Sequence, residues 1–272
     1  RIFTLKINSM RHVLKMALIL LFFHFAMEAS ARYPEYDSLT YVSDRGDSLL
    51  YRQLSPLEIE PGEKYPLVLF LHGAGERGSD NLSQLTHGAG MFSNPVHREK
   101  YPAFVLFPQC PADLYWPTPT RPDGFKSESP FPLDAEISQP LAAVKALLDE
   151  FIESNPVDKN RIYVVGLSMG GMGTLDLVCR YPDLFAAAVP ICGGIHTERL
   201  NDFSSPTAFR IFHGDADSVV PVRFSREAYL KLKEEGANVE YIEFPGVNHN
   251  SWDPAFSRDD FLPWLFGKRS PL

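Results

Sequence analysis

Short apolar runs recur along the chain, and glycine-rich or polar loops follow most of them. Such runs, with little polar alternation, are typical of strands buried on both faces of a parallel sheet. A more mixed segment, at residues 239–244, also has strand character. We therefore predict strands at residues 67–71, 103–107, 162–165, 186–191, 208–212 and 239–244.

Helical periodicity appears between these strands. Ile137, Leu141, Val144, Leu148 and Ile152 are spaced by four, three, four and four residues, which places them on one face of a helix. An alternating order of strands and helices without internal repeats is typical of an α/β domain. We predict a mostly parallel central sheet with helices on both faces, and further helices at residues 174–180, 222–235 and 254–266.

Two segments depart from this alternation. Residues 36–55 alternate around Arg45–Asp47, which predicts an antiparallel hairpin at the N-terminal edge of the sheet. Residues 108–133 contain seven prolines and several aromatic residues, a composition too irregular for regular structure and too aromatic for a disordered linker. We predict a packed loop that shapes a pocket.

The first 31 residues resemble a targeting segment. Arg11 and Lys15 precede an apolar run at residues 16–27, and small residues follow at Ala29–Ala31. This pattern predicts a secretory signal peptide and is too short for a membrane anchor. We expect Met10 to be the initiator, with residues 1–9 upstream of it, and residues 32–272 to form a single domain. The alternative to a signal peptide is that the apolar run forms a buried N-terminal helix.

Charge and cysteine content exclude several classes of partner. The chain has a formal net charge of −8, and its first 31 residues hold four basic side chains and one acidic, so residues 32–272 carry −11. This balance argues against nucleic acids and anionic membranes as partners. Cys110, Cys179 and Cys192 allow at most one intrachain disulfide, and we expect them to be small buried hydrophobic residues rather than metal ligands.

A serine lies in a glycine cluster directly after the apolar strand at residues 162–165. Gly166, Ser168 and Gly170 spell G-x-S-x-G, and a helix is predicted to follow. This spacing indicates a sharp strand-to-helix turn that exposes the serine hydroxyl above the sheet. The Met169 amide then begins a helix, where free donors favour a developing oxyanion. The alternative is a glycine-rich junction with an incidental serine.

A serine nucleophile requires a base and an acid to orient that base. Asp215 and Asp217 follow the strand at residues 208–212, and His249 follows the strand at residues 239–244. Both loops leave the sheet at the edge where Ser168 is expected. The order Ser168, Asp217, His249 is the order of an α/β-hydrolase triad.

Four ordered motifs resemble those of the α/β-hydrolase superfamily across residues 60–266. The resemblance is to esterases and dienelactone-hydrolase-like enzymes, more narrowly to secreted esterases near the feruloyl and acetyl carbohydrate esterases, and to prolyl-oligopeptidase-like hydrolases. The motifs are LHGAGERGSDN at residues 71–81, GLSMGG at 166–171, HGDAD at 213–217 with VP at 220–221, and GVNHNSW at 246–252.

The resemblance implies Ser168 as nucleophile, His249 as base and Asp217 as acid, with Asp215 as the rival acid. It implies an oxyanion hole formed by the amides of Met169 and Ala74. Gly73 or Gly75 remains an alternative to Ala74. The family pattern H-G-x-x-D-x-x-V-P falls on Asp217.

Other residues near these motifs have both structural and functional interpretations. We place Trp116, in the proline-rich loop, and Trp252, three residues after His249, at the pocket mouth as substrate-binding residues, with core packing as the alternative. His72 and His213 each precede a glycine at a strand end, and we expect both to brace loops.

The leading hypothesis is a secreted serine carboxylic-ester hydrolase that works through an acyl-enzyme without a cofactor or metal. The resemblance favours small or polysaccharide-linked esters, such as feruloyl or acetyl groups on plant-type polysaccharide. The alternatives are a serine peptidase of prolyl-oligopeptidase-like type and a non-catalytic binding protein on a hydrolase scaffold. No metal set, phosphate loop or dinucleotide motif occurs in the sequence.

Overall fold

A computed structural model describes residues 33–271, except residues 44–45, 47, 118–124 and 126–129. The chain divides into two units, Arg1–Glu35 and Tyr36–Leu272. Every element described below belongs to the second unit. The predicted signal peptide lies outside the described residues, so it stays a prediction.

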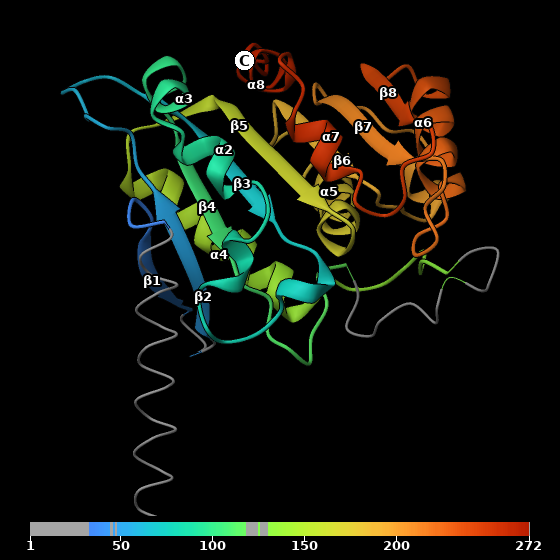
Figure 1. Cartoon of the computed structure of the whole chain (residues 1–272), viewed down its shortest axis with the longest axis horizontal. Helices are drawn as coiled ribbons and strands as arrows, with labels where there is room; N and C mark the ends of the chain where they lie inside the picture. Colours follow the sequence, from blue (N-terminus) through green and yellow to red (C-terminus); the bar gives the residue numbers. More distant parts are fainter. Residues whose placement is uncertain (1–32, 44–45, 47, 118–124, 126–129, 272) are drawn as a thin grey trace, which may run out of the picture. The chain divides into compact units, whose positions relative to one another are not determined.

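Eight strands form one sheet in the order β1-β2-β4-β3-β5-β6-β7-β8 (Figure 1). β1 and β2 form the predicted antiparallel hairpin, β2 also pairs antiparallel with β4, and all other pairs are parallel. This arrangement confirms the predicted fold class. The strands are β1 (Asp37–Val42), β2 (Ser48–Leu54), β3 (Tyr65–Leu71), β4 (Phe104–Pro108), β5 (Val157–Leu167), β6 (Ala187–Ile191), β7 (Ala208–Gly214) and β8 (Val239–Phe244).

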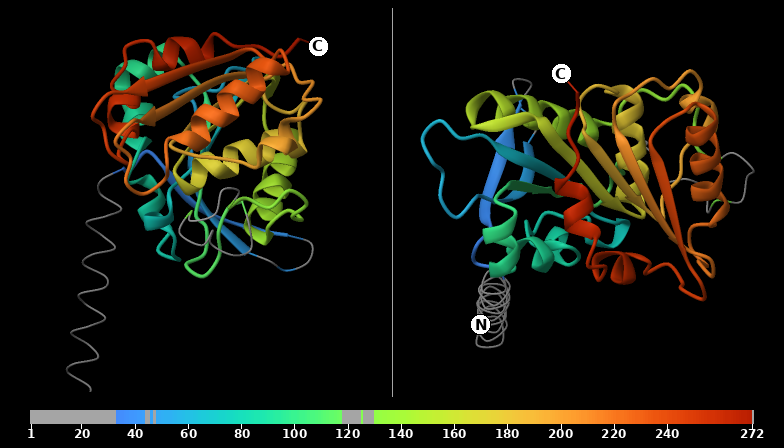
Figure 2. Two further views of the ribbon diagram at one scale, coloured as in Figure 1. Left: turned by 90° about the vertical axis from the view of Figure 1, so that its right-hand side faces the viewer. Right: turned by 90° about the horizontal axis from the view of Figure 1, so that it is seen from above.

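The helices of the described residues cover both faces of the sheet (Figure 2). Three of them exceed ten residues, and the remainder are short helices and 3-10 turns. The α-helices are α2 (Ala89–Ser93), α3 (Pro95–Lys100), α4 (Gln139–Ser154), α5 (Met169–Arg180), α6 (Arg223–Glu234), α7 (Trp252–Phe256) and α8 (Phe261–Phe266). The 3-10 turns are η1 (Ala74–Glu76), η2 (Ser83–Leu85) and η3 (Thr197–Leu200).

Each strand contributes side chains to the apolar layers on both faces of the sheet, because successive residues point to opposite faces. Leu69 of β3 and Val164 of β5 belong to the core cluster that contains α4, α5 and α6 side chains. On the other face, Phe70 contacts Phe92 of α2 and Phe256 of α7. The unbroken apolar runs in the sequence thus give strands that can be buried on both faces.

One predicted helix is divided in the structure. The segment predicted as a helix at residues 254–266 forms α7 and α8, separated by Ser257–Asp260. Pro263 explains the break, since proline lacks an N–H and its ring collides with the preceding helical turn. When the helix restarts at Phe261, Pro263 falls in the first turn, where its missing N–H has no partner to lose.

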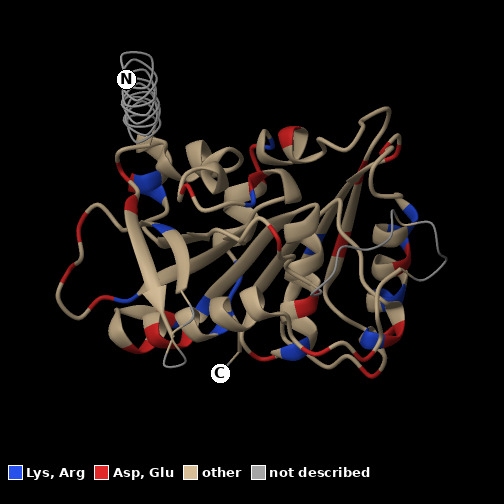
Figure 3. Ribbon diagram, turned by 90° about the horizontal axis from the view of Figure 1, so that it is seen from below, with Lys and Arg blue, Asp and Glu red and all other residues tan. Residues whose placement is uncertain are grey.

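Basic and acidic residues are both distributed along the helices, strands and loops of the ribbon (Figure 3). Several pair locally, including Lys145 with Asp149 at 2.6 Å and Arg226 with Glu243 at 2.7 Å. Among the described residues, no helix has both the length and the apolar character needed to cross a bilayer.

Candidate active site

Ser168 occupies the turn between β5 and α5, as the G-x-S-x-G spacing predicts. Its backbone has φ 53° and ψ −116°, a strained conformation for a residue with a side chain. A Cβ on Gly170 would lie 1.9 Å from the carbonyl oxygen of Leu71, and one on Gly166 would lie 2.2 Å from that of Gly170. Glycine is therefore required on both sides of the serine.

His249 joins Ser168 to Asp217 in one hydrogen-bonded chain. The Ser168 hydroxyl lies 2.9 Å from Nε2 of His249, and Nδ1 of His249 lies 2.8 Å from Oδ2 of Asp217. A carboxylate only accepts hydrogen bonds, so Nδ1 donates to Asp217 and Nε2 is left to accept from the serine. The structure thus brings the three predicted residues together with the polarity that nucleophilic catalysis requires.

The Asp217 carboxylate is buried and fully engaged by donors. Its Oδ1 accepts from the backbone N–H groups of Val219 and Val220, at 2.8 Å and 2.9 Å, and its Oδ2 accepts from His213 as well as from His249. Burial alone raises the pKa of this carboxyl, but these hydrogen bonds outweigh it and hold the pKa below its usual range. Asp217 therefore remains an anion at neutral pH.

Asp215, the rival acid, is turned to a different task. Its side chain is exposed, and Oδ1 accepts from the backbone N–H of Gly246 at 2.6 Å. That bond fastens the loop after β7 to the loop after β8. The geometry thus brings Asp217, not Asp215, to His249.

Asn248 was missed by the sequence reasoning, although it directly precedes His249. Its Oδ1 accepts from the backbone N–H of Ser218, the hydroxyl of Ser218 and the backbone N–H of His249, at 2.8–3.0 Å. This one carbonyl oxygen joins the loop of the acid to the loop of the base. Together with the bond from Gly246 to Asp215, it fastens the loop that carries Asp217 to the loop that carries His249.

The loop after β3 passes beside the nucleophile. A Cβ on Gly73 would lie 3.7 Å from the Cβ of Ser168. Ala74 begins η1 and Met169 begins α5, and the first N–H groups of a helix have no partner within it. The two amides proposed for the oxyanion hole thus each start a helical segment, one directly after Ser168 and the other in the loop beside it.

His72 braces this loop, as expected. Its Nδ1 lies 2.6 Å from the carbonyl oxygen of Gly73, and its Nε2 accepts from the backbone N–H of Cys110 at 3.0 Å. Burial lowers the pKa of His72 to about 4, so the ring is neutral at neutral pH.

Trp116 corrects the sequence-based expectation. Its side chain is 0% exposed, and its indole N–H donates to the carbonyl oxygen of His72 at 3.1 Å. A ring sealed from solvent does not form a wall of the substrate pocket. Trp116 instead packs beneath the loop that carries Ala74, which is the core alternative.

Trp252 does lie at the candidate site. Its ring is half-buried, 5.4 Å from the ring of His249 in an edge-to-face arrangement and 5.0 Å from the ring of His87. His87 in turn lies 3.8 Å from the carboxylate of Glu76 in the loop after β3. Trp252 therefore connects the base to the loop after β3.

The cysteines are free, and Cys192 adjoins the site. Ligand-type atoms of Cys192, Asp217 and His249 lie within 4.8 Å of one another. Asp217 and His249 already bond each other and their partners, and burial raises the pKa of the Cys192 thiol, which keeps it protonated. The ligand-type atoms of these three residues are therefore already engaged or protonated.

Known proteins resemble this chain in sequence. The family model for phospholipases and carboxylesterases matches residues 57–258. A probable carboxylesterase of Oryza sativa subsp. japonica is 27% identical over 209 residues, which cover 72% of this chain and 76% of that protein.

Two solved structures share the fold. A thermostable esterase is 37% identical with a TM-score of 0.75, covering 87% of this chain, which spans 64% of that esterase. A ferulic acid esterase from Anaeromyces mucronatus is 16% identical with a TM-score of 0.61, covering 85% of this chain and 90% of its own.

Proposed function

Since the chain belongs to the phospholipase/carboxylesterase family of α/β-hydrolases and is a carboxylesterase-type hydrolase, we propose that Ser168, His249 and Asp217 are its catalytic triad. One observation carries this proposal. The serine hydroxyl, both imidazole nitrogens and a buried carboxylate form a continuous hydrogen-bonded chain of 2.9 Å and 2.8 Å.

In this mechanism Ser168 Oγ attacks the ester carbonyl while His249 Nε2 takes the hydroxyl proton. Asp217 stabilises the resulting imidazolium through the Nδ1–H bond. The tetrahedral intermediate expels the alcohol, which takes its proton from Nε2 and leaves an acyl group on Ser168. Water, deprotonated by His249, then attacks that acyl group and releases the acid.

The oxyanion hole is proposed to consist of the backbone N–H groups of Met169 and Ala74. Donors that exist before the reaction stabilise the intermediate without reorganisation, and loss of one such donor typically lowers kcat about 10²–10³-fold. The position of Gly73 next to Ser168 supports the assignment, because Ala74 is the next residue in that loop.

For the substrate, we propose an ester with an aryl or bulky acyl group, such as a feruloyl group on plant-type polysaccharide. Trp252 supports this class because its half-buried ring contacts the ring of His249. Trp252→Ala should lower kcat/KM for methyl ferulate about 10-fold more than for p-nitrophenyl acetate, the scale of apolar differences in a pocket. Equal losses on the two esters would remove the support for an aryl preference.

A substrate panel separates the classes of function. Purified protein is offered p-nitrophenyl acetate, methyl ferulate and an aminoacyl p-nitroanilide. Turnover of esters alone supports the proposed esterase, whereas turnover of the anilide favours the peptidase. Turnover of none favours a binding protein on a hydrolase scaffold.

Secretion and domain organisation belong to the same proposal. We propose that residues 1–31 comprise upstream residues 1–9 and a secretory leader that begins at Met10, and that residues 32–272 form one catalytic domain. Expression of the whole chain in a secreting host, followed by N-terminal sequencing, should give Arg32 as the first residue. A secreted protein that begins elsewhere, or no secretion, would contradict this boundary.

A further inference from the structure

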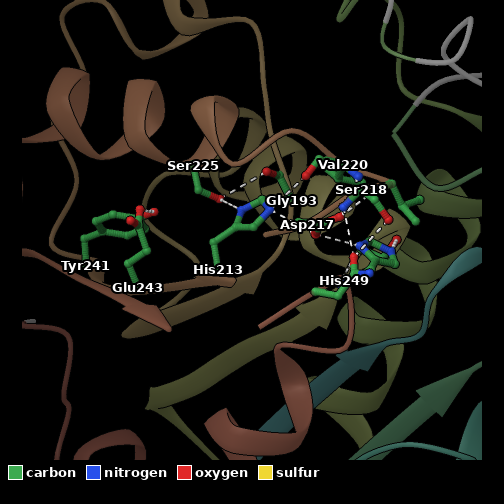
Figure 4. A network of polar contacts seen from close by, with 12 residues as sticks. Gly193, His213, Asp217, Ser218, Val220, Ser225, Tyr241, Glu243 and His249 are labelled. Atoms are coloured by element: carbon green, nitrogen blue, oxygen red, sulfur yellow. Dashed lines mark hydrogen bonds and ion pairs between the residues drawn. The ribbon is translucent and has the colours of Figure 1, made fainter. Parts of the chain in front are cut away.

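A second buried histidine, His213, touches the carboxylate of Asp217. His213 lies near the end of β7, four residues before Asp217, and both side chains are 0% exposed. Its Nε2 lies 3.1 Å from Oδ2 of Asp217 and 3.0 Å from the carbonyl oxygen of Val220. Figure 4 shows Asp217 between the imidazole rings of His213 and His249.

The partners of His213 fix where its proton lies. Both partners of Nε2 are acceptors, a carboxylate and a backbone carbonyl, so Nε2 must carry a hydrogen whether the ring is neutral or cationic. At the other side of the ring, Nδ1 lies 2.7 Å from the hydroxyl of Ser225, which can donate to it. That hydroxyl has a single hydrogen, which it donates either to Nδ1 or to the carbonyl oxygen of Gly193 at 3.2 Å; neither choice changes the hydrogen on Nε2.

We propose that His213 is a positioning residue for the reaction, acting through Asp217 on His249. This inference rests on the triad proposed above. The Nε2–H of His213 donates to Oδ2 of Asp217, the same oxygen that receives the Nδ1–H of His249. It replaces the water that an exposed carboxylate would bind, and it holds that oxygen in line with the base while His249 gains its positive charge.

Other charged groups around His213 are already engaged. Glu243 of β8 stands opposite His213 in the strand register, and its carboxylate bonds Arg226 at 2.7 Å and 2.8 Å and Tyr241 at 2.5 Å. Hydrogen bonds from Arg226 outweigh a smaller opposing effect of burial and lower the pKa of Glu243 to about 2. Among the carboxylates that face the ring, Asp217 is therefore the one that His213 serves as a donor.

Two substitutions at His213 separate donation from packing. His213→Met fills the space without a donor, whereas His213→Gln places an amide nitrogen near the position of Nε2. We expect His213→Met to lower kcat for p-nitrophenyl acetate about 10- to 100-fold, the effect of losing one hydrogen bond to a charged group, with little change in KM. His213→Gln should recover most of that loss. Equal losses in the two variants would overturn the proposal.

A double-mutant cycle tests whether the effect passes through Asp217. In an Asp217→Asn background, His213→Met should lower kcat by no more than about two-fold, because the carboxylate it serves is gone. His72→Met is the matched control, since His72 is also a buried histidine at a strand end but braces the loop after β3, which carries Ala74. The fold-loss in kcat caused by His72→Met should be the same in the Asp217→Asn background as in the wild-type protein. An undiminished effect of His213→Met in the same background would refute the inference.

A measurement on the unaltered protein covers the case in which His213→Met does not fold. Nitrogen NMR of ¹⁵N-histidine-labelled protein, with the His213 signal assigned from its loss in His213→Gln, should show Nε2 protonated from pH 5 to pH 9. An unprotonated Nε2 would overturn the proposal. This outcome does not depend on activity, so it is distinguishable from failure of the proposed esterase function.

Discussion

Replacing Asp217 by asparagine removes one negative charge from the candidate triad and leaves the size of the side chain almost unchanged. The buried carboxylate accepts the Nδ1–H of His249 at 2.8 Å, which selects the tautomer whose Nε2 faces Ser168. An asparagine can offer its NH₂ group to Nδ1 instead. The ring would then carry its proton on Nε2 and lose its ability to accept the serine proton.

The size of the effect follows from the distance. With charge centres roughly 4 Å apart and an effective dielectric constant of about 20, the carboxylate stabilises the imidazolium by about 4 kcal/mol. That free energy corresponds to about 10³-fold in rate. Adding the unfavourable tautomer, we expect Asp217→Asn to lower kcat by about 10³- to 10⁴-fold with KM nearly unchanged.

The assay is steady-state hydrolysis of p-nitrophenyl acetate, with circular dichroism to show that each variant is folded. Asp215→Asn is the matched control, because that exposed side chain bonds Gly246 and not the base. It should lower kcat by no more than about three-fold. A larger loss for Asp215→Asn than for Asp217→Asn would refute the reasoning.

Further predictions concern the loop beside the serine and the turn that carries it. The free energy of unfolding should fall by about 3 kcal/mol as pH is lowered from about 6.5 to about 4, because His72 has a depressed pKa and the unfolded chain binds the proton first. The stabilising contribution of neutral His72 is fully present above pH 6.5. In urea titrations, His72→Gln should remove this dependence of the free energy of unfolding on pH. Trp116→Ala should destabilise the protein by about 3–5 kcal/mol because the ring is buried in the core. It should lower kcat/KM equally for methyl ferulate and p-nitrophenyl acetate. Unequal losses would instead indicate that Trp116 contacts the substrate. Gly170→Ala should give no folded protein, whereas Gly75→Ala, whose added Cβ meets nothing within 4 Å, should fold with a nearly unchanged Tm.

The sequence predicts the sheet and the placement of the candidate triad because both depend on local patterns. Apolar runs mark strands buried on both faces, and parallel strands present their following loops at one edge. Ser168, Asp217 and His249 each follow a strand of the parallel part of the sheet, so their approach could be predicted without knowing any long-range contact.

Features that depend on distant contacts could not be predicted in this way. The indole of Trp116 bonds the carbonyl of His72, 44 residues away, and an aromatic residue in a proline-rich loop has the same pattern whether it lies in the core or at a pocket. From its position before a glycine at a strand end, the sequence predicts only that His213 braces a loop. Its contact with Asp217 depends on how the chain turns after β7, although the spacing of four residues is a usable signal.

The most direct test of the central claim is the rate at which Ser168→Ala hydrolyses p-nitrophenyl acetate. We expect the variant to fold and to retain only the catalysis of the oxyanion donors and binding, about 10³–10⁴ over water. A variant that keeps more than about a tenth of the wild-type kcat would show that another group is the nucleophile, and the account of the site would be wrong.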